Sequence, residues 1–374
     1  MILPREPVRD LTPTLHGGIQ AHDLERLGLR RDQLLDFSVG TNPYPPPSSV
    51  VEAARSVPIE AYPDSRARRL QEALAALLGL DSKQISVVNG TSQALWLIAL
   101  AFLRPGDEVL TFPPTYGDYR TVSTIMGART TELRTRSEDE FVPDLEVASR
   151  LIRERPVRVI WLCNPNNPTS TYLSRGELEP LLETCRQQGT LLVLDEAYAS
   201  FSPKRFSTEE LIGRYPLLLM RSMTKDFNLN ALRLGYIAAS AGIAEIIDRV
   251  QPPWSVNTPA EEAGLMALQE LDYYRRSWKK TAELTESLGV AIEKIGFKRY
   301  PVGCNFQLFE GPLELDLAEK LWKRGMKIRD CSSFGLPGFF RIGTRGGSDN
   351  DRLTEAIAEI YSMSSNSPRK RGDR

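Results

Sequence analysis

Polar residues end or follow five apolar runs of this chain, and their types could support chemistry at one shared site. The runs read as strands, and the polar clusters lie at residues 89–92, 116, 164–167, 195–198 and 222–225. Sites in parallel sheets form beyond the carboxyl ends of the strands. The clusters should therefore converge on one edge of a sheet, where they would bring together a lysine, carboxylates, phenols and amides.

Lys225 is the most informative of these residues. It lies in RSMTKDFNLNALRLGY (residues 221–236), where charged residues alternate with Met, Phe and Leu. Burying a charge costs free energy unless the charge is paired or used. A lysine can act as a nucleophile or base near neutral pH when desolvation and neighbouring cations lower its pKa. Taken alone, Lys225 could equally be a surface residue at the end of a strand.

Alternating patterns between about residues 83 and 240 predict the elements that carry the clusters. We expect strands at QISVVNG, DEVLTF, VRVIWLCNP, LLVLDEAY, LLLMRSM and LGYIAAS, and helices at TSQALWLIALAFL, TYGDYRTVSTIMG and SRGELEPLLETCRQQG. Runs that are apolar on both faces are typical of a sheet covered by helices on both sides. The fold class is therefore α/β, with a mostly parallel seven-stranded sheet flanked by helices in a large domain at residues 46–254.

The rest of the chain predicts a smaller unit and two peripheral segments. From about residue 255 a long helical pattern leads into short strands and helices, which fits a small α+β domain at residues 255–362. Residues 1–45 would form an N-terminal arm and part of this small domain. Residues 363–374 are polar and basic, and we expect a disordered tail there.

Composition and motifs exclude several other classes. A net charge of -1 gives no reason to expect a nucleic-acid partner. The start lacks the apolar core of a signal peptide, and the longest apolar run has about half the length of a membrane span. We therefore expect a cytoplasmic protein without a membrane partner. Four cysteines without a CxxC pattern and two histidines indicate no metal site. LLVLDE is typical of a Walker B strand, but the matching phosphate loop G-x-x-x-x-G-K-[ST] is absent from the sequence.

Taken together, the clusters resemble the fold type I pyridoxal-phosphate enzymes, the aspartate aminotransferase superfamily. SMTKDFNLNALRLGY is similar to the superfamily signature around the cofactor lysine, and NPNNPT, LDEAY and YPD are similar to companion motifs. The resemblance extends from LDFSVGTNP to FFRIGTRGG. It implies pyridoxal 5'-phosphate as the cofactor and a homodimer with shared active sites.

The resemblance also implies catalytic roles. Lys225 would form a Schiff base with the cofactor and move the α-proton of the substrate. Asp195 would face the pyridine nitrogen and keep it protonated. Tyr198 and Asn167 would donate hydrogen bonds to the phenolic oxygen of the ring. These residues are the expected catalytic centre.

Further residues would hold the cofactor. The phosphate would be bound at a helix start and by a hydroxyl and a guanidinium. The residues are Gly90, Thr91, Ser92, Ser222 and Arg233. Tyr116 would stack on the ring, with Tyr119 as the alternative, and Tyr62 would reach the phosphate from the partner subunit.

For the substrate, Arg341 matches the arginine that binds the α-carboxylate through both of its terminal nitrogens. Asn42 lies where the amino-terminal segment of the superfamily closes over the substrate. Within the superfamily the sequence resembles the group of histidinol-phosphate aminotransferase and L-threonine O-3-phosphate decarboxylase. This resemblance implies that His16 and Arg329 hold a distal phosphate of the substrate.

The reaction stays open between two outcomes. The sequence predicts an aminotransferase acting on a small, phosphorylated amino acid or amine. The alternative is an L-threonine O-3-phosphate decarboxylase-like enzyme of cobalamin biosynthesis, which HGG, PPWSVN and IRDCSSF favour. The two reactions differ in which bond of the substrate stands perpendicular to the ring, and a sequence does not show that orientation. A protein that binds the cofactor without turnover is a third reading, which the complete set of Lys, Asp, Tyr and Arg disfavours.

Overall fold

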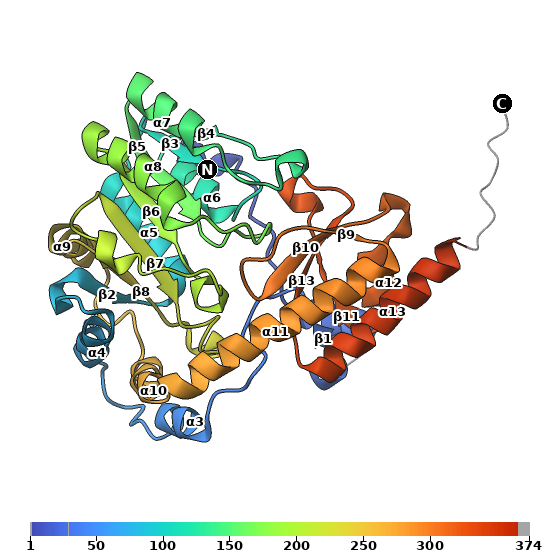
Figure 1. Cartoon of the computed structure of the whole chain (residues 1–374). Helices are drawn as coiled ribbons and strands as arrows, with labels where there is room; N and C mark the ends of the chain where they lie inside the picture. Colours follow the sequence, from blue (N-terminus) through green and yellow to red (C-terminus); the bar gives the residue numbers. More distant parts are fainter. Residues whose placement is uncertain (1, 29, 366–374) are drawn as a thin grey trace.

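A seven-stranded sheet forms the centre of the larger part of the molecule (Figure 1). The computed structural model describes residues 2–28 and 30–365. The strand order is β2-β8-β7-β6-β5-β3-β4. Strand β8 runs in the direction opposite to that of the other six strands. The strands are β2 (Ile85–Val88), β3 (Glu108–Thr111), β4 (Arg129–Glu132), β5 (Val157–Cys163), β6 (Leu191–Asp195), β7 (Leu217–Ser222) and β8 (Gly235–Ala239). The prediction of a mostly parallel seven-stranded sheet is confirmed.

Strand β4 is the member of this sheet that the apolar patterns did not reveal. Its sequence RTTE has no apolar residue, and its four side chains are exposed or only partly buried. It pairs with β3 alone and so forms an edge of the sheet. An edge strand has one unpaired side and fewer neighbours to pack against, so it needs no apolar run.

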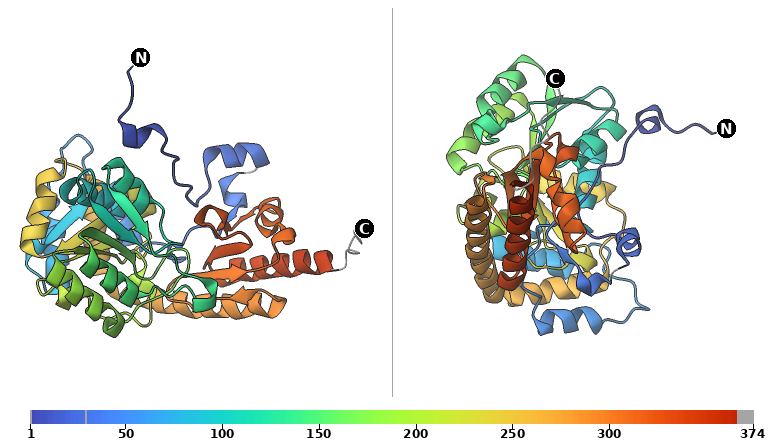
Figure 2. Two further views of the ribbon diagram at one scale, coloured as in Figure 1. Left: turned by 90° about the horizontal axis from the view of Figure 1, so that it is seen from above. Right: turned by 90° about the vertical axis from the view of Figure 1, so that its right-hand side faces the viewer.

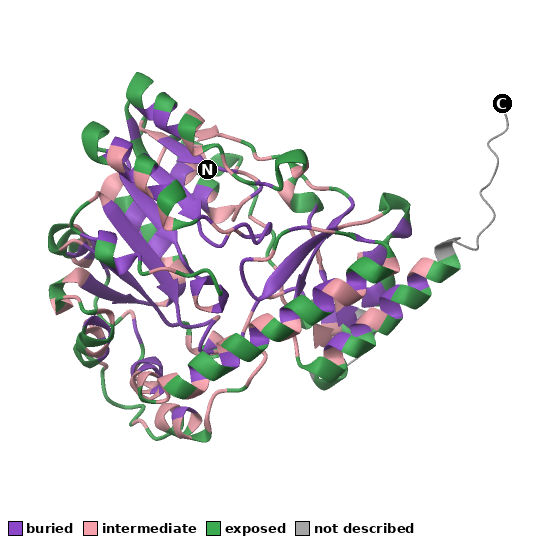
Figure 3. Cartoon of the chain, viewed as in Figure 1, coloured by how far each residue is buried: buried purple, intermediate pink, exposed green. Residues whose placement is uncertain are grey.

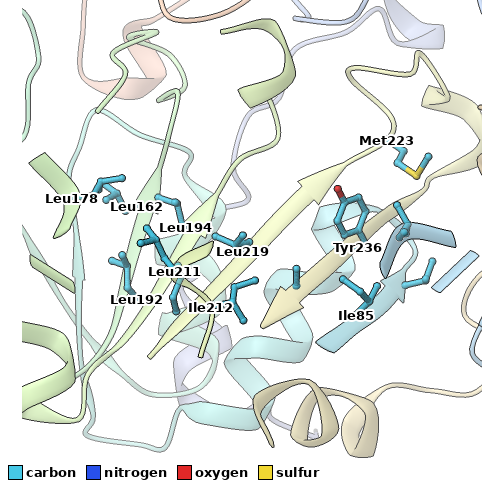
Figure 4. Packing of buried hydrophobic residues seen from close by; sticks show 14 of the residues in the cluster. Ile85, Leu162, Leu178, Leu192, Leu194, Leu211, Ile212, Leu219, Met223 and Tyr236 are labelled. Atoms are coloured by element: carbon cyan, nitrogen blue, oxygen red, sulfur yellow. The ribbon is translucent and has the colours of Figure 1, made fainter. Parts of the chain in front are cut away.

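Helices cover both faces of the sheet, and the strands supply apolar side chains to both. In β6, Leu192 and Leu194 point to one face, while Leu191 and Val193 point to the other. The first face packs against α4 (Arg68–Leu78), α7 (Leu145–Glu154), α8 (Arg175–Gln188) and α10 (Thr258–Gln269). Figure 4 shows part of this cluster. The second face packs against α5 (Gly90–Phe102), α6 (Asp118–Ile125) and α9 (Ala241–Val250). In Figure 3 the central strands are buried and the outer sides of these helices are exposed.

A second, smaller sheet lies beside the first. It has four strands in the order β12-β13-β10-β9, all antiparallel. Its strands are β9 (Lys298–Arg299), β10 (Phe306–Glu310), β12 (Arg329–Asp330) and β13 (Phe339–Gly343). The long helix α11 (Leu271–Ile295) runs from the larger part of the molecule to this sheet (Figure 1). Helices α12 (Leu317–Trp322) and α13 (Gly347–Ser365) pack with α11 around the apolar core of this smaller part.

The first residues of the chain join both parts. Strand β1 (Leu35–Asp36) pairs with β11 (Met326–Lys327), so the end of the expected arm lies with the smaller part. Helices α1 (Glu6–Arg9), α2 (Ala21–Leu27) and α3 (Ser48–Arg55) precede or follow β1 within the first 55 residues. Figure 2 shows the segment with α1 extending away from the body of the molecule. The pairing of β1 with β11 agrees with the predicted N-terminal arm, whereas α10 packs on the larger sheet although its residues were assigned to the smaller domain. The domain boundaries remain our proposal.

In two segments the structure differs in detail from the sequence prediction. The helical pattern after residue 257 is divided between α10 and α11, because Glu270 ends the first helix and begins the second. Helix α13 continues through Ser365, so residues 363–365 are helical where we expected the tail to begin. The rest of that tail lies outside the described residues. Within the residues that are described, no helix has the length and apolar character needed to span a bilayer.

Candidate active site

A cavity of about 320 Å³ lies at the carboxyl ends of β5, β6 and β7. Residues at or just after the ends of these strands form one side, and Arg329 of β12 and Arg341 of β13 contribute from the smaller sheet. The predicted site residues that line it are His16, Thr91, Ser92, Tyr116, Asn167, Asp195, Tyr198, Lys225, Arg233, Arg329 and Arg341. The structure thus brings most of the predicted residues together from distant parts of the chain.

Lys225 lies in this cavity with its side chain partly withdrawn from solvent. Burial, followed by the nearby charges of Arg341 and Arg233, lowers the pKa of Lys225 to about 8. The backbone around it is fixed from far along the chain, because the Lys225 carbonyl accepts the N–H of Asn42 at 2.8 Å. A lysine with this pKa is partly neutral near pH 7 and can act as a nucleophile or a base.

Asp195 is the last residue of β6 and is buried at the cavity wall. Burial raises its pKa to about 6, and two hydrogen bonds act in the opposite direction. Its Oδ1 accepts the N–H of Ala197 at 3.0 Å, and its Oδ2 accepts the hydroxyl of Tyr119 at 2.7 Å. The carboxylate therefore has a fixed orientation beside the cavity.

Tyr116 and Tyr119 have separate places in the structure. Tyr116 lines the cavity, and its ring meets Tyr119 edge-on with centroids 5.6 Å apart. Tyr119 is fully buried behind it and donates to Asp195. This geometry favours Tyr116 over Tyr119 as the residue that could stack on a ring in the cavity.

The start of α5 forms one end of the cavity. Thr91 and Ser92 belong to its first turn, where backbone N–H groups have no partner within the helix. Gly90 has a φ of +70°, and a Cβ there would lie 3.1 Å from a guanidinium nitrogen of Arg233. A Cβ on Gly235 would lie 2.8 Å from the Arg221 carbonyl oxygen and 3.1 Å from the Thr91 nitrogen. Because neither glycine has a Cβ, the first turn of α5 can lie close to Arg233 and to the backbone of β8. The N–H groups of this turn and the guanidinium together form a site that could bind an anion.

Arg341 and Arg329 face each other across β13 and β12, as their paired register requires. Arg341 is buried and donates to Asn167 Oδ1 and to the Ser38 carbonyl, while its Nε has no hydrogen-bond partner among the described residues. Arg329 Nη2 donates to the Leu15 carbonyl at 2.8 Å and to Ser333 Oγ at 2.7 Å. Burial and the charge of Arg341 lower the pKa of Arg329.

His16 reaches the same region from the N-terminal segment. Its Nε2 lies 3.6 Å from Asp118 Oδ2, and its ring centroid lies 5.7 Å from that of Tyr116. Half of its side chain is exposed. The N-terminal segment therefore closes one side of the cavity with His16.

The cavity has an excess of unpaired positive charge. Lys225, Arg233, Arg329 and Arg341 all line it, and in the part of the chain that is described none of them forms an ion pair with a carboxylate. Arg341 is buried and Lys225 and Arg329 are partly buried, and such cations are normally paired, whereas Arg233 is exposed. A ligand with several negative charges is the natural partner for this set. The described residues contain no group of three or more His, Cys, Asp or Glu side chains suited to a metal ion.

Four predicted residues do not line the cavity: Gly90, Ser222, Asn42 and Tyr62. Gly90 acts through its backbone, as described above. Ser222 is buried and its hydroxyl lies 2.6 Å from that of Thr224, which does line the cavity. The sequence prediction missed Thr224, although its position directly before Lys225 was a signal.

Asn42 and Tyr62 do not reach the cavity of their own subunit. The Asn42 amide donates to the Asp226 carbonyl at 2.9 Å and to Ser277 Oγ at 2.8 Å, and its Oδ1 accepts the Tyr44 N–H. With its polar atoms satisfied inside the protein, Asn42 supports the Lys225 loop and does not reach the cavity. Tyr62 has 82% of its surface exposed and packs against Trp254, at a ring-centroid distance of 5.2 Å.

Comparison with known proteins identifies the family. The model of aminotransferase class I and II matches residues 32–360. This chain belongs to the aminotransferase class I and II family. A histidinol-phosphate aminotransferase of Symbiobacterium thermophilum is 32% identical over 358 residues, which cover 94% of this chain and 97% of that protein.

Two solved structures place the fold. Histidinol-phosphate aminotransferase of Sinorhizobium meliloti, in complex with pyridoxal-5'-phosphate, has a TM-score of 0.86 at 22% identity and covers 96% of this chain and 98% of that one. L-threonine-O-3-phosphate decarboxylase of Porphyromonas gingivalis has a TM-score of 0.75 at 25% identity and covers 88% of this chain and 100% of that one. The chain is thus a fold type I, pyridoxal-phosphate-dependent aminotransferase, as its sequence predicted.

The residues of the cavity fit this cofactor. An aldehyde requires an amine, which Lys225 supplies, and a phosphate requires donors, which the start of α5 and Arg233 supply. A pyridine nitrogen that must stay protonated requires an anion, and Asp195 is the buried carboxylate of the cavity wall. The cofactor chemistry and the donor set therefore agree.

Proposed function

We propose that this aminotransferase acts on a small phosphorylated amino acid or amine, with Lys225 as the residue that holds the cofactor covalently and moves the proton. The observation that carries the proposal is the set of four cations without carboxylate partners around one cavity. The cofactor phosphate accounts for one of them, Arg233. Arg329 and Arg341 remain for the negative groups of the substrate.

Within this proposal, the cofactor is held at three points. Thr91, Ser92 and Arg233 bind its phosphate. The hydroxyl of Ser222 forms a hydrogen bond with that of Thr224, which lines the cavity. Asp195 faces its ring nitrogen and Tyr116 covers its ring. Bound pyridoxal phosphate supplies an electron-accepting ring, which allows a bond of the amino-bearing carbon to break heterolytically.

The remaining residues act on the substrate and on the proton. Lys225, neutral in part because of its lowered pKa, takes the proton from the amino-bearing carbon and returns it at the other end of the reacting system. Tyr198 and Asn167 lie at the cavity wall and orient the oxygen of the ring. Arg341 binds a carboxylate, for which its unpartnered Nε is available.

Arg329 and His16 are proposed to hold the distal phosphate of the substrate. Both line the cavity on the side of the N-terminal segment, next to Arg341. The named function of the 32% identical relative and that of the P. gingivalis structure both involve phosphorylated amino compounds. Histidinol phosphate has a phosphate and no carboxylate, whereas L-threonine O-3-phosphate has both groups and so requires a second cationic position beyond the carboxylate site.

The proposal also covers the oligomeric state of the protein and its place in the cell. We propose a homodimer in which Tyr62 of each subunit reaches the cofactor phosphate of the other. The exposure of Tyr62 and its packing against the half-exposed Trp254 support this arrangement, because an exposed aromatic pair is typical of an interface. On the sequence grounds given above, we propose that the dimer works in the cytoplasm.

Decarboxylation of L-threonine O-3-phosphate is the second candidate. The 25% identical decarboxylase structure, which covers 88% of this chain, favours it. The same residues serve either reaction, since the choice depends on whether the C–H or the C–CO₂ bond stands perpendicular to the ring. Relatives above 30% identity that are named histidinol-phosphate aminotransferases place aminotransfer first.

Product analysis with two substrates tests the function. With histidinol phosphate, the purified holoenzyme should lose its cofactor-derived visible absorbance, and 2-oxoglutarate should restore it. With L-threonine O-3-phosphate, release of CO₂ would establish decarboxylation instead. If neither compound changes the absorbance or yields product, the proposed substrate class is wrong.

Replacing Arg329 with alanine tests the distal phosphate position. Loss of a charge-assisted contact to phosphate should weaken binding of L-threonine O-3-phosphate by about 10–100-fold. Binding of L-threonine, which has no phosphate, should change little. The measurement is the absorbance change of the holoenzyme on titration with each compound. Arg324→Ala is the matched control, because Arg324 pairs with Glu359 and does not line the cavity. Equal weakening of both ligands would remove Arg329 from this role.

A further inference from the structure

Tyr119 has a role in this site that the motifs do not assign. Its ring is fully buried one turn beyond Tyr116, and its hydroxyl donates to Asp195 Oδ2 at 2.7 Å. The two residues are 76 positions apart in the sequence. The contact is therefore a product of the fold, in which α6 brings a phenol within hydrogen-bond distance of the carboxylate at the end of β6.

The position of Tyr119 is fixed by its neighbours. Its ring stacks on Trp161 of β5, with centroids 5.6 Å apart and planes within 4° of parallel. Trp161 Nε1 donates to Ser123 Oγ at 3.1 Å, and that hydroxyl donates to the Tyr119 carbonyl at 2.7 Å. Ring and backbone of Tyr119 are thus held together, and its hydroxyl has little freedom to leave Asp195.

The phenol is suited to act as a permanent donor. Burial, and then the charge of Asp195, raise the pKa of Tyr119 well above its usual value. The hydroxyl therefore keeps its proton throughout the working range of an enzyme. The protonation state of Asp195 is less firmly fixed than that of Tyr119. Burial favours the neutral form of the Asp195 carboxyl group, while hydrogen bonds from Tyr119 and Ala197 favour its ionised form.

We propose that Tyr119 is a positioning residue, which keeps the Asp195 carboxylate ionised and aimed at the ring nitrogen of the cofactor. The inference rests on the proposed role of Asp195. An anion at that place stabilises the protonated ring nitrogen, and the protonated ring is the better electron acceptor. Tyr119 does not line the cavity and would act only through the carboxylate.

Tyr119→Phe removes the hydroxyl and leaves the stacking on Trp161 in place. We expect kcat to fall by roughly tenfold, since a hydrogen bond to a charged group is lost, with little change in the KM of the amino substrate. A more neutral Asp195 should let the ring nitrogen lose its proton. The nitrogen that joins Lys225 to the cofactor then becomes more basic, so the pH midpoint of the visible absorbance should rise by about 0.5–1 unit.

Tyr274→Phe is the matched control. Tyr274 is also fully buried, and among the described residues its hydroxyl has no hydrogen-bond partner. It lies on α11 and does not line the cavity. This variant should keep the wild-type absorbance midpoint and kcat.

A double-variant comparison separates a positioning role from a structural one. In Asp195→Asn protein, the added Tyr119→Phe change should leave the absorbance midpoint where Asp195→Asn alone puts it. An unchanged midpoint in Tyr119→Phe protein, or an equal shift in both backgrounds, would overturn the inference. Failure of the proposed function looks different, because the wild-type holoenzyme would then respond to neither histidinol phosphate nor L-threonine O-3-phosphate, whereas the absorbance midpoints are measured without substrate.

Discussion

Lys225→Ala protein is expected to show no covalent cofactor absorbance and to lose turnover. The side chain is the amine of the cavity, and burial with two neighbouring guanidiniums lowers its pKa to about 8. Its replacement removes both the attachment point and the base. Loss of proton transfer alone should lower kcat by about 10²–10⁴-fold. The visible spectrum of protein reconstituted with pyridoxal phosphate, and its turnover of the substrate identified above, measure the two effects.

Lys204→Ala is the control for this experiment, because Lys204 is exposed and does not line the cavity. It should retain the wild-type spectrum and rate. A small primary amine added to Lys225→Ala protein should restore part of the rate, since it can accept the proton that the lysine no longer takes. Normal turnover by the Lys225→Ala protein would contradict the assignment, and so would absence of cofactor absorbance in the wild-type protein.

The parts of this site that the sequence predicted share one physical property. Asp195 and Lys225 stand at or after the ends of strands with apolar residues on both faces. Such strands are buried between helices, so polar residues at their carboxyl ends are conspicuous and their convergence on one edge follows from the parallel sheet. The resemblance to a known superfamily then supplied the roles.

The parts that the sequence did not predict depend on contacts between distant residues. The hydroxyl of Tyr119 meets Asp195 only because α6 packs on the sheet and its Tyr119 stacks on Trp161 of β5, the neighbour of β6, and nothing near either residue in the sequence shows this contact. Asn42 is held by the Asp226 carbonyl and by Ser277 of α11, 235 positions away, so it supports the lysine loop from outside the cavity. Strand β4 was missed because its residues are polar, and the break at Glu270 was missed because no Gly or Pro marks it.

The charge of the cavity connects the fold to the choice of substrate. Register in the smaller sheet sets Arg329 opposite Arg341, and the segment between β7 and β8 of the larger sheet supplies Lys225 and Arg233. The smaller and the larger part of the molecule each contribute two cations to the cavity. Cofactor and substrate together must balance these two pairs of positive charges. In our proposal, the phosphate of the cofactor binds Arg233 and its aldehyde reacts with Lys225. We propose that a substrate with a carboxylate and a phosphate, such as L-threonine O-3-phosphate, binds to the other pair. The two arginines should then discriminate between those two groups.

Arg341→Lys should weaken binding of carboxylate-bearing ligands and leave cofactor binding intact. The guanidinium already donates through both terminal nitrogens, to Asn167 and to the Ser38 carbonyl, and its Nε remains available. A lysine keeps the charge but loses the planar fork that matches a carboxylate. We expect about a 10²-fold weaker affinity for L-threonine O-3-phosphate, since charge-assisted hydrogen bonds are lost from a buried position.

The ligand pair that tests this prediction differs only in the carboxylate. 1-Aminopropan-2-yl phosphate is L-threonine O-3-phosphate without its carboxylate, and its affinity should change by less than about threefold in Arg341→Lys protein, because its phosphate contacts remain. Arg352→Lys, on the exposed side of α13, is the control and should change neither affinity. Arg329→Ala should give the reverse preference for phosphate. If Arg341→Lys weakened both ligands equally, Arg341 would be holding the phosphate, and the two arginines would have exchanged their proposed roles.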